Sequence, residues 1–164
     1  MARTDQAGDA NEVTVRQSGR GHAASVVQNG SGNTVTVTES GAGGGEAFIL
    51  QNGGANRAQV LQNTMTGANL LNLWQDGSEN AASVVQEGSL NAIDLEQSGD
   101  RNNADLSQTG DENKMDVQQL GDQSLTARQD GSQSVLVFRD ALGGPAISIT
   151  QTGVGAPPVI ITKQ

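Results

Sequence analysis

The amino-acid sequence predicts an all-β protein: a two-sheet β-solenoid, or parallel in-register β-helix, of about 14 short strands in about 7 layers. Three features support this fold class: a regular spacing of glutamine, an alternation of apolar residues before each glutamine, and a glycine after it. The dominant spacing is eleven residues. The recurring glutamines stand at positions 6, 17, 28, 51, 62, 75, 86, 97, 108, 119, 129, 151 and 164.

Each repeat unit starts with Asn, carries apolar residues at its third and fifth positions, and ends its strand with Gln, as in the segment from Asn80 to Gly88. Of 28 such apolar positions, 27 hold an apolar residue, and the exception is Thr162. Fourteen units start at positions 11, 22, 33, 45, 56, 69, 80, 91, 102, 113, 123, 133, 145 and 158. They predict a repeat domain over residues 11–164, preceded by a short N-terminal segment, residues 1–10, that we expect to be flexible.

Side chains two residues apart project from the same face of a strand, so the Asn, both apolar residues and the Gln of a unit are expected to share a face. A glycine two residues after the Gln predicts a tight reversal with positive φ. The predicted turn glycines are Gly77, Gly88, Gly99 and Gly110.

Because the chain reverses after every unit, two strands complete one coil, and each strand is expected to pair in parallel with the strand two units later. Alternate units carry small inward pairs such as Ala58 and Val60, and the units between them carry larger pairs such as Leu71 and Leu73. These complementary volumes predict a thin core without voids.

The composition excludes several function classes. The chain of 164 residues has 2 Phe, 1 Trp and no Tyr, too few to fill a conventional globular core. Its net charge of −9 opposes binding to nucleic acid. With no Cys and one His, no catalytic, cofactor-binding or metal-binding residue is assigned. No apolar run reaches the length of a signal peptide or a membrane span, so we expect a mature, soluble chain.

Asn and Gln repeated at one position in successive layers are expected to form ladders, because each side-chain amide can donate to one neighbouring layer and accept from the other. Such ladders would hold the register that apolar burial alone leaves loose. The predicted ladder residues are Asn56, Asn80 and Asn102 with Gln62, Gln86 and Gln108 in one set of units, and Asn69, Asn91 and Asn113 with Gln75, Gln97 and Gln119 in the other.

The paired Asn and Gln spacing between Gln86 and Gln97, and again between Gln97 and Gln108, resembles the curlin repeat family. The resemblance spans nearly the whole chain. It implies a structural subunit, without enzymatic activity or cofactor, of an extracellular amyloid-like curli fibre on the bacterial cell surface. It also implies self-assembly into a homopolymer, a role in biofilm matrix and surface adhesion, and two kinds of partner: a nucleator subunit and outer-membrane secretion machinery.

Several units depart from the repeat pattern. Glu39 and Arg139 are predicted to replace the strand-ending Gln. The strand-starting Asn is replaced at His22, Gly45, Gln123, Gln133, Pro145 and Pro158. These departures leave open whether the chain is a major fibre subunit or a nucleator.

Both ends of the predicted solenoid would carry unpaired backbone groups, and the sequence shows no obvious cap. Head-to-tail docking of the last layer on the first layers would continue the ladders into an open filament. Pro157 and Pro158 are expected to slow this addition. The predicted polymer interface consists of Ile147, Ile149 and Ile160 at one end and Val13, Val15 and Val26 at the other.

An apolar patch is predicted on the outward face, where it could bundle filaments or touch a surface. Asp94 and Asp116 are expected in adjacent layers of that face, where stacked like charges are unfavourable. We therefore expect assembly to accelerate as the pH falls. The patch residues are Phe48, Leu50, Leu70, Trp74, Leu136 and Phe138.

Three other interpretations stay open. A non-polymerising repeat adhesin or a fibre nucleator would share the same repeats. Asp- and Gly-rich turns at residues 99–103 and 110–113 suggest a calcium-binding β-roll, although its nonapeptide spacing is missing. Thr34, Thr36 and Thr38 suggest an ice-binding solenoid, although neighbouring strands do not repeat the row.

Overall fold

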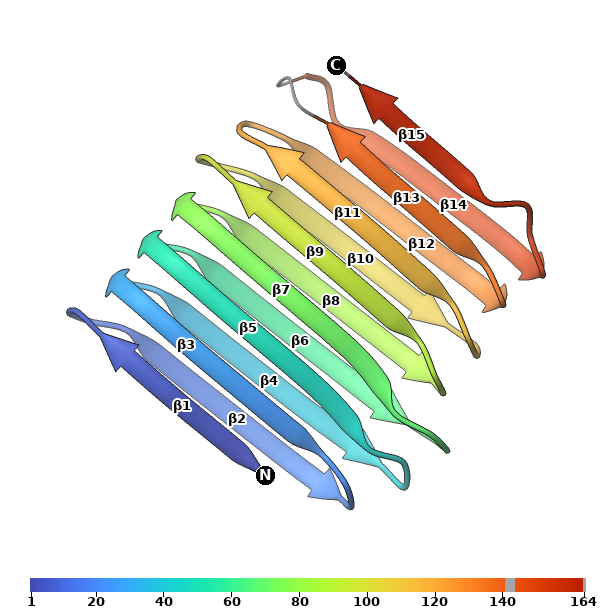
Figure 1. The fold of residues 1–164 in the computed structure, drawn as a ribbon, viewed down its shortest axis with the longest axis horizontal. Helices are drawn as coiled ribbons and strands as arrows, with labels where there is room; N and C mark the ends of the chain where they lie inside the picture. The colour runs from blue at the N-terminus through green and yellow to red at the C-terminus, as the bar shows by residue number, and fades with distance from the viewer. Residues whose placement is uncertain (141–143, 164) are drawn as a thin grey trace.

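The computed structural model describes residues 1–140 and 144–163, and these contain fifteen β-strands in two parallel sheets. Consecutive strands alternate between the sheets, so each strand pairs with the strand two positions later (Figure 1). The predicted all-β, two-sheet solenoid is confirmed. Gln164, the last glutamine of the predicted repeat, lies outside the described residues.

The eight-stranded sheet consists of β1 (Ala2–Ala7), β3 (Ala23–Ser31), β5 (Gly45–Gly54), β7 (Asn69–Ser78), β9 (Ala92–Ser98), β11 (Lys114–Leu120), β13 (Val135–Asp140) and β15 (Val159–Lys163). The seven-stranded sheet consists of β2 (Glu12–Gly19), β4 (Thr34–Gly41), β6 (Arg57–Thr64), β8 (Ala81–Gly88), β10 (Asn103–Thr109), β12 (Ser124–Ser132) and β14 (Ile147–Val154).

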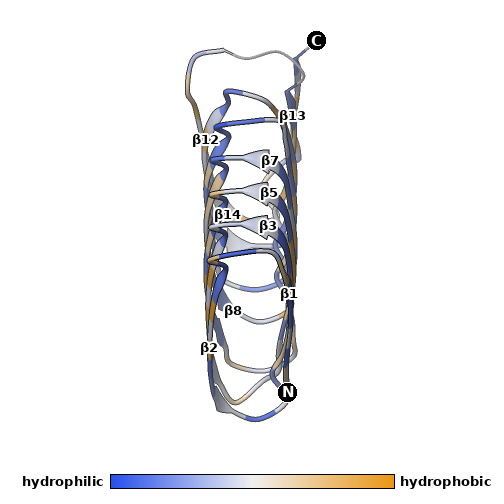
Figure 2. Ribbon diagram, turned by 90° about the vertical axis from the view of Figure 1, so that its left-hand side faces the viewer, coloured by the Kyte–Doolittle hydropathy of each residue, from blue (hydrophilic) through white to orange (hydrophobic). Residues whose placement is uncertain are grey.

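The core is a single thin layer of side chains between the two sheets, which face each other in Figure 2. Small residues of one sheet accompany large residues of the other: Ala82 and Ala104 belong to β8 and β10, whereas Leu71 and Ile93 belong to β7 and β9, and all four are buried. Alternation with period 2 explains why these strands form, because only a pleated strand buries every second residue.

One strand lies in the segment that precedes the predicted repeats. β1 pairs with β3 in register, and Gln6 of β1 stands beside Gln28 of β3. Its inward positions include Ala2 and Thr4, a weaker apolar pair than in later strands. The described part of the chain therefore has one strand more than the fourteen predicted units.

The predicted register of the twelfth unit, which starts at position 133, is wrong by one residue. Leu136 and Phe138, which the repeat pattern placed outward, are buried beside Met115 and Val117 of β11. A shift of one residue moves every side chain to the opposite face. This register buries the larger apolar pair and keeps a guanidinium out of the core: Arg139 lies outside, and Asp140 takes the position of the strand-ending Gln.

β15 follows the shifted register, so the inward placement of Ile160 and Thr162 is also wrong. Val159 and Ile161 pack against the core and pair with Leu136 and Phe138 of β13, whereas Ile160 is 69% exposed.

Candidate functional site: amide ladders and open ends

Glutamine side chains form a hydrogen-bonded column inside each sheet. In the eight-stranded sheet the Nε2 of Gln75 donates to Oε1 of Gln97 at 2.8 Å, and Gln97 donates to Gln119 at 2.9 Å. Gln28 and Gln51 continue this column in the N-terminal direction. The seven-stranded sheet has an equivalent column in which the successive pairs from Gln62 through Gln86, Gln108 and Gln129 to Gln151 are joined at 2.7, 3.0, 2.9 and 2.8 Å.

Each glutamine also reaches across to the other sheet. The second amide proton of Gln86 is donated to the backbone oxygen of Leu70 at 3.1 Å, and that of Gln97 to the oxygen of Ala81 at 3.0 Å. These buried amides therefore have partners along the column and across the core, and they tie layers and sheets together.

The asparagine columns combine a side-chain bond of the predicted kind, from Nδ2 of Asn102 to Oδ1 of Asn80 at 3.0 Å, with bonds to the backbone of the next layer. Oδ1 of Asn69 accepts from the backbone N–H of Asn91 at 3.0 Å, and Oδ1 of Asn91 accepts from the N–H of Asn113 at 3.0 Å. The Nδ2 of Asn91 donates to the backbone oxygen of Gly110 at 2.7 Å. Asn56, Asn80 and Asn102 form the equivalent column in the other sheet. The side chain of each Asn thus links the turn beside it, by hydrogen bonds, to the backbone of the next layer.

His22 takes the place of an Asn. Its Nδ1 accepts from the backbone N–H of Gly45 at 3.0 Å, as an Asn oxygen would, and its Nε2 lies 3.1 Å from the oxygen of Ser18, four residues earlier. Asn102 donates to the oxygen of Ser98 over the same four-residue span. His22 is thus a structural residue of the Asn column, with both ring nitrogens occupied.

The turns of successive layers lie in close contact with one another. Gly77, Gly88, Gly99 and Gly110 all have positive φ, and a Cβ on Gly88 would stand only 2.1 Å from the oxygen of Gly110. A second left-handed position, which the repeat pattern did not predict, is the residue before most column Asn residues, which includes Glu79, Leu90, Arg101 and Glu112.

Acidic residues of the turns accept hydrogen bonds from backbone N–H groups. Oδ1 of Asp100 accepts from the N–H of Ser78 at 2.8 Å, and Oδ1 of Asp111 accepts from the N–H of Ser89 at 2.8 Å. Among residues 1–140 and 144–163, no group of three or more His, Asp or Glu side chains is placed to hold a metal ion. The described chain also contains no helix that could cross a membrane.

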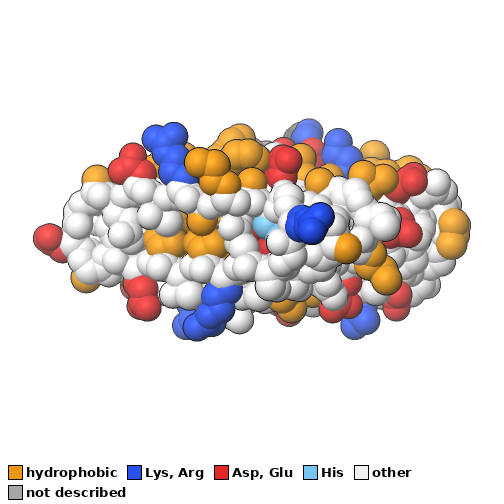
Figure 3. All heavy atoms as spheres, turned by 90° about the horizontal axis from the view of Figure 1, so that it is seen from below, with side chains coloured by type: hydrophobic (Ala, Val, Ile, Leu, Met, Phe, Trp, Pro, Cys, Tyr) orange, Lys and Arg blue, Asp and Glu red, His pale blue; other side chains and the backbone are white. Residues whose placement is uncertain are grey.

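The ends of the solenoid differ in chemistry. β1 and β2 form the N-terminal end, and β14 and β15 form the C-terminal end. Val13 and Val15 are partly buried at the first end, Ile147 is partly buried at the other, and Ile149 there is only 8% exposed. Val26 is fully buried in β3, beneath β1, and so lies one layer inside. Seen from below, hydrophobic side chains are visible both between two bands of white atoms and on the margins, and charged side chains lie mainly along the margins (Figure 3).

The glutamine columns also give the solenoid a direction. Gln6 donates to Gln28 at 2.7 Å and Gln17 donates to Glu39 at 2.5 Å, so the amides donate toward the C-terminal end. A column of this kind ends in an acceptor oxygen at the N-terminal end and a donor at the other. At the C-terminal end the donor is the Nε2 of Gln151, which contacts the oxygen of Pro157 at 3.0 Å.

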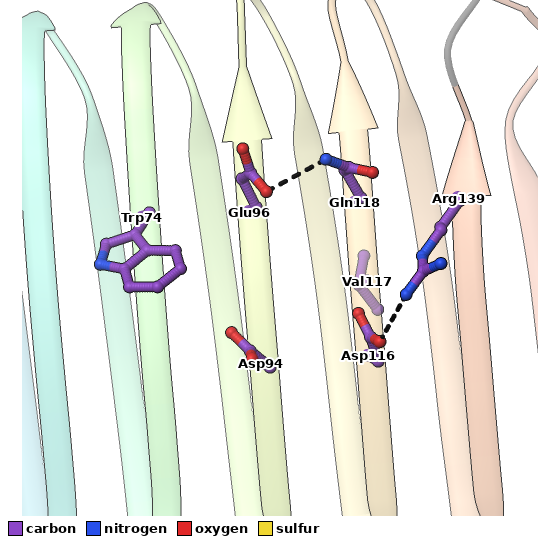
Figure 4. Close-up of a pocket in the computed structure, with 7 residues that line it drawn as sticks. All are labelled: Trp74, Asp94, Glu96, Asp116, Val117, Gln118 and Arg139. Atoms are coloured by element: carbon purple, nitrogen blue, oxygen red, sulfur yellow. Dashed lines mark hydrogen bonds and ion pairs between the residues drawn. The ribbon is translucent and has the colours of Figure 1, made fainter.

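The outer face of the eight-stranded sheet carries a shallow hollow of about 150 Å³ (Figure 4). Trp74 lies at one side of it and is 48% exposed. Asp94 and Asp116 occupy adjacent layers as predicted, and Arg139 contacts Asp116 at 3.1 Å. Phe48 is 46% exposed, whereas Leu50 and Leu70, two further residues of the predicted patch, are partly buried.

The geometry defines a class of protein: a parallel two-sheet β-solenoid with internal amide columns and open ends. The description Curlin associated repeat matches residues 8–41, 67–99 and 91–121, which together cover more than half of the chain. The chain therefore belongs to the curlin repeat family, and membership supports a curli-type structural subunit. No curated protein and no solved structure matches the chain.

Proposed function

We propose that the protein is a self-assembling subunit of an extracellular curli-like fibre that supports biofilm matrix and surface adhesion. The observation that carries this proposal is the complementarity of the two ends, which present matching apolar side chains and opposite hydrogen-bonding groups. Secretion through outer-membrane machinery and a nucleator partner belong to the same proposal, and they rest on family membership alone.

Extending the register of the seven-stranded sheet would place β14 of one copy on β2 of the next. Ile147 would then meet Val13, Ile149 would meet Val15, and the Nε2 of Gln151 would meet the Oε1 of Gln17. This contact continues both the apolar core and the glutamine column. A heterologous contact of this kind does not close, so it produces a filament.

Extending the other sheet would place β15 on β1. Val159 would meet Ala2, Ile161 would meet Thr4, and Lys163 would meet Gln6. Lys163 already contacts Asp140 at 3.4 Å, and its ammonium group carries three donors. The column of this sheet therefore also ends in a donor that faces an acceptor, and no like charges oppose each other at the junction.

The Pro157 carbonyl occupies the position that an incoming Gln17 oxygen would take on Gln151. Addition of a subunit exchanges one acceptor for another. This exchange agrees with the predicted slowing effect of Pro157 and Pro158, because the terminal amide donor of Gln151 contacts Pro157 until a second copy displaces that contact.

Disulfide cross-linking tests the proposed junction, and the natural chain has no cysteine to interfere. Thr14 and Ser148 point outward and would face each other across the junction. In-register neighbours in adjacent strands lie close enough for a disulfide. Fibres grown from a mixture of the Thr14→Cys and Ser148→Cys variants should yield oxidised dimers, and fibres of either variant alone should not.

The matched control replaces Thr14→Cys with Thr36→Cys, one layer further inside in the same row. It should give no cross-link with Ser148→Cys. Dimers in single-variant fibres would indicate head-to-head packing and contradict the proposal. Monomer that never forms fibres, by thioflavin fluorescence and electron microscopy, would favour the non-polymerising adhesin.

A further inference from the structure

The glutamine column of the seven-stranded sheet is interrupted at one place. Glu39 occupies the glutamine position in β4, directly beside Gln62 of β6. Gln17 donates to Oε2 of Glu39 at 2.5 Å, and Gln62 donates onward to Gln86 at 2.7 Å. Between Glu39 and Gln62 no bond is formed. Oε1 of Glu39 and Oε1 of Gln62 are both buried without a hydrogen-bond partner.

The two unpartnered oxygens both lie beside Gly45 of the facing sheet. A Cβ built on Gly45, in the facing sheet, would stand 2.8 Å from Oε1 of Gln62 and 3.4 Å from Oε1 of Glu39. Neither oxygen can donate while the carboxyl is ionised, and two adjacent acceptors cannot satisfy each other. Buried polar atoms without partners are costly, so this pair is a weak point in the column.

Rotating the amide of Gln62 does not remove the conflict. Its Nε2 donates to Gln86 and to the backbone oxygen of Glu46 at 3.4 Å, so rotation would set two oxygens against each other at Gln86. Rotating every amide of the column would set the oxygen of Gln151 against the oxygen of Pro157. The contact of Gln151 with Pro157 therefore fixes the direction in which the amides of the column donate. The group that the column lacks is a hydrogen atom on the Glu39 carboxyl.

We propose that Glu39 is a buried protonation site that completes the glutamine column: the neutral carboxyl donates its Oε1–H to Oε1 of Gln62 while Oε2 accepts from Gln17. The proton comes from solvent, and no covalent bond of the chain changes. When the carboxyl ionises, β4 and β6 lose this link. The subunit therefore becomes more stable on acidification, whether or not it assembles.

The surroundings of Glu39 agree with this role. Burial is the largest influence and raises the pKa of the Glu39 carboxyl, and Glu46 raises it further. The hydrogen bond from Gln17, the His22 ring and the Met1 amino group act in the opposite direction, and the net effect is a raised pKa. A group whose pKa is raised on folding stabilises the folded state fully below its unfolded pKa, and this stabilisation is lost as the pH rises through the folded pKa.

The Glu39→Gln variant tests the proposal, because an amide donates to Gln62 at every pH. Thermal unfolding of the dilute monomer, followed by circular dichroism between about pH 5 and pH 7.5, covers the window in which the unfolded carboxyl is ionised. Glu39→Gln should unfold at least about 2 °C above the natural chain at the upper pH. This advantage should shrink toward the lower pH. The control Glu87→Gln, an exposed carboxylate that is not among the groups that shift the pKa of Glu39, should keep the pH dependence of the natural chain.

A direct titration supplies a second measurement that does not depend on the variant. The side-chain carboxyl carbon of Glu39, followed by NMR in 13C-labelled protein, should titrate above the ordinary glutamate range. Titration within or below that range would overturn the proposal, as would a Glu39→Gln variant less stable than the natural chain near neutral pH. Stabilisation near neutral pH by sodium or potassium alone would show that a cation occupies the gap, and would overturn it too.

Discussion

The Nε2 of Gln97 donates to the Oε1 of Gln119, twenty-two residues later in the sequence, at 2.9 Å inside a fully buried column. The same atom also donates to the backbone oxygen of Ala81 in the opposite sheet. One side chain thus connects two layers and two sheets, which explains how a protein with few aromatic residues keeps a single register.

Removing the side chain of Gln97 should lower the free energy of unfolding. Gln97→Ala leaves Gln75 without its acceptor and Gln119 without its donor, and each buried unpartnered group costs about 1–3 kcal/mol. We expect a total loss of roughly 3 kcal/mol in the free energy of unfolding, measured by urea denaturation of the monomer. Gln59→Ala, at an exposed outward position, is the control and should change stability little. Equal losses in the two variants would refute an internal glutamine column.

Two glycines distinguish backbone strain from steric contact between stacked turns. Gly121 has a φ of +73°, and nothing lies within 4 Å of a Cβ built on it. Gly88 has a φ of +113°, and its Cβ would meet the oxygen of Gly110 at 2.1 Å. We expect Gly121→Ala to cost about 1–2 kcal/mol and Gly88→Ala clearly more, measured as thermal stability. A Gly88→Ala variant no worse than Gly121→Ala would show that the turns do not stack.

The carboxyl group of Asp94, on the outer face, should make the stability of the subunit depend on pH. Burial raises its pKa, and the Asp116 carboxylate in the next layer raises it further. Because the folded-state pKa is raised, the subunit should lose stability as the pH rises through that value. Asp94→Asn should therefore stabilise the monomer at neutral pH. Fibre growth of the natural chain should also be faster near pH 4.5 than near pH 8, because protonation relieves the stacked charges.

The control for this effect is Asp105→Asn, because the layer neighbours of Asp105 are Ser83 and Thr126. It should leave the pH dependence unchanged. Fibre growth that is equal or slower at the lower pH would argue against a contribution from the Asp94 and Asp116 pair.

The register of β13 can be tested with two neighbouring residues. Phe138 is 1% exposed and Val137 points outward. Phe138→Ala should cost about 3–5 kcal/mol, whereas Val137→Ala should cost a small fraction of that. A larger loss of unfolding free energy for Val137→Ala than for Phe138→Ala, measured by the same urea denaturation, would instead support the register that the repeat pattern predicts.

The strands, their parallel pairing and their inward residues could be predicted from the sequence, because period 2 and an eleven-residue spacing act together over most of the chain. The prediction failed where the pattern is ambiguous. Residues 135–138 are four consecutive apolar residues, so either alternate pair could face inward. Gln133 has a φ of +60°, the conformation found just before other column residues, and this places Ser134 in the Asn column. That conformation is not visible in the sequence.

Two further features lay beyond the repeat pattern. β1 has Gln6 in phase with the later glutamines, but Ala2 and Thr4 give it no strong apolar pair. The conflict between Glu39 and Gln62 depends on the direction in which every amide of the column donates, and that direction is set by the contact of Gln151 with Pro157 at the far end.

An electron cryo-microscopy map of the assembled fibre tests the central claim most directly. The account predicts a continuous internal column in which Gln151 of one subunit lies beside Gln17 of the next, with the layer spacing of about 4.8 Å unbroken across the junction. A map in which these glutamines face solvent, or in which the junction interrupts the layer spacing, would contradict it.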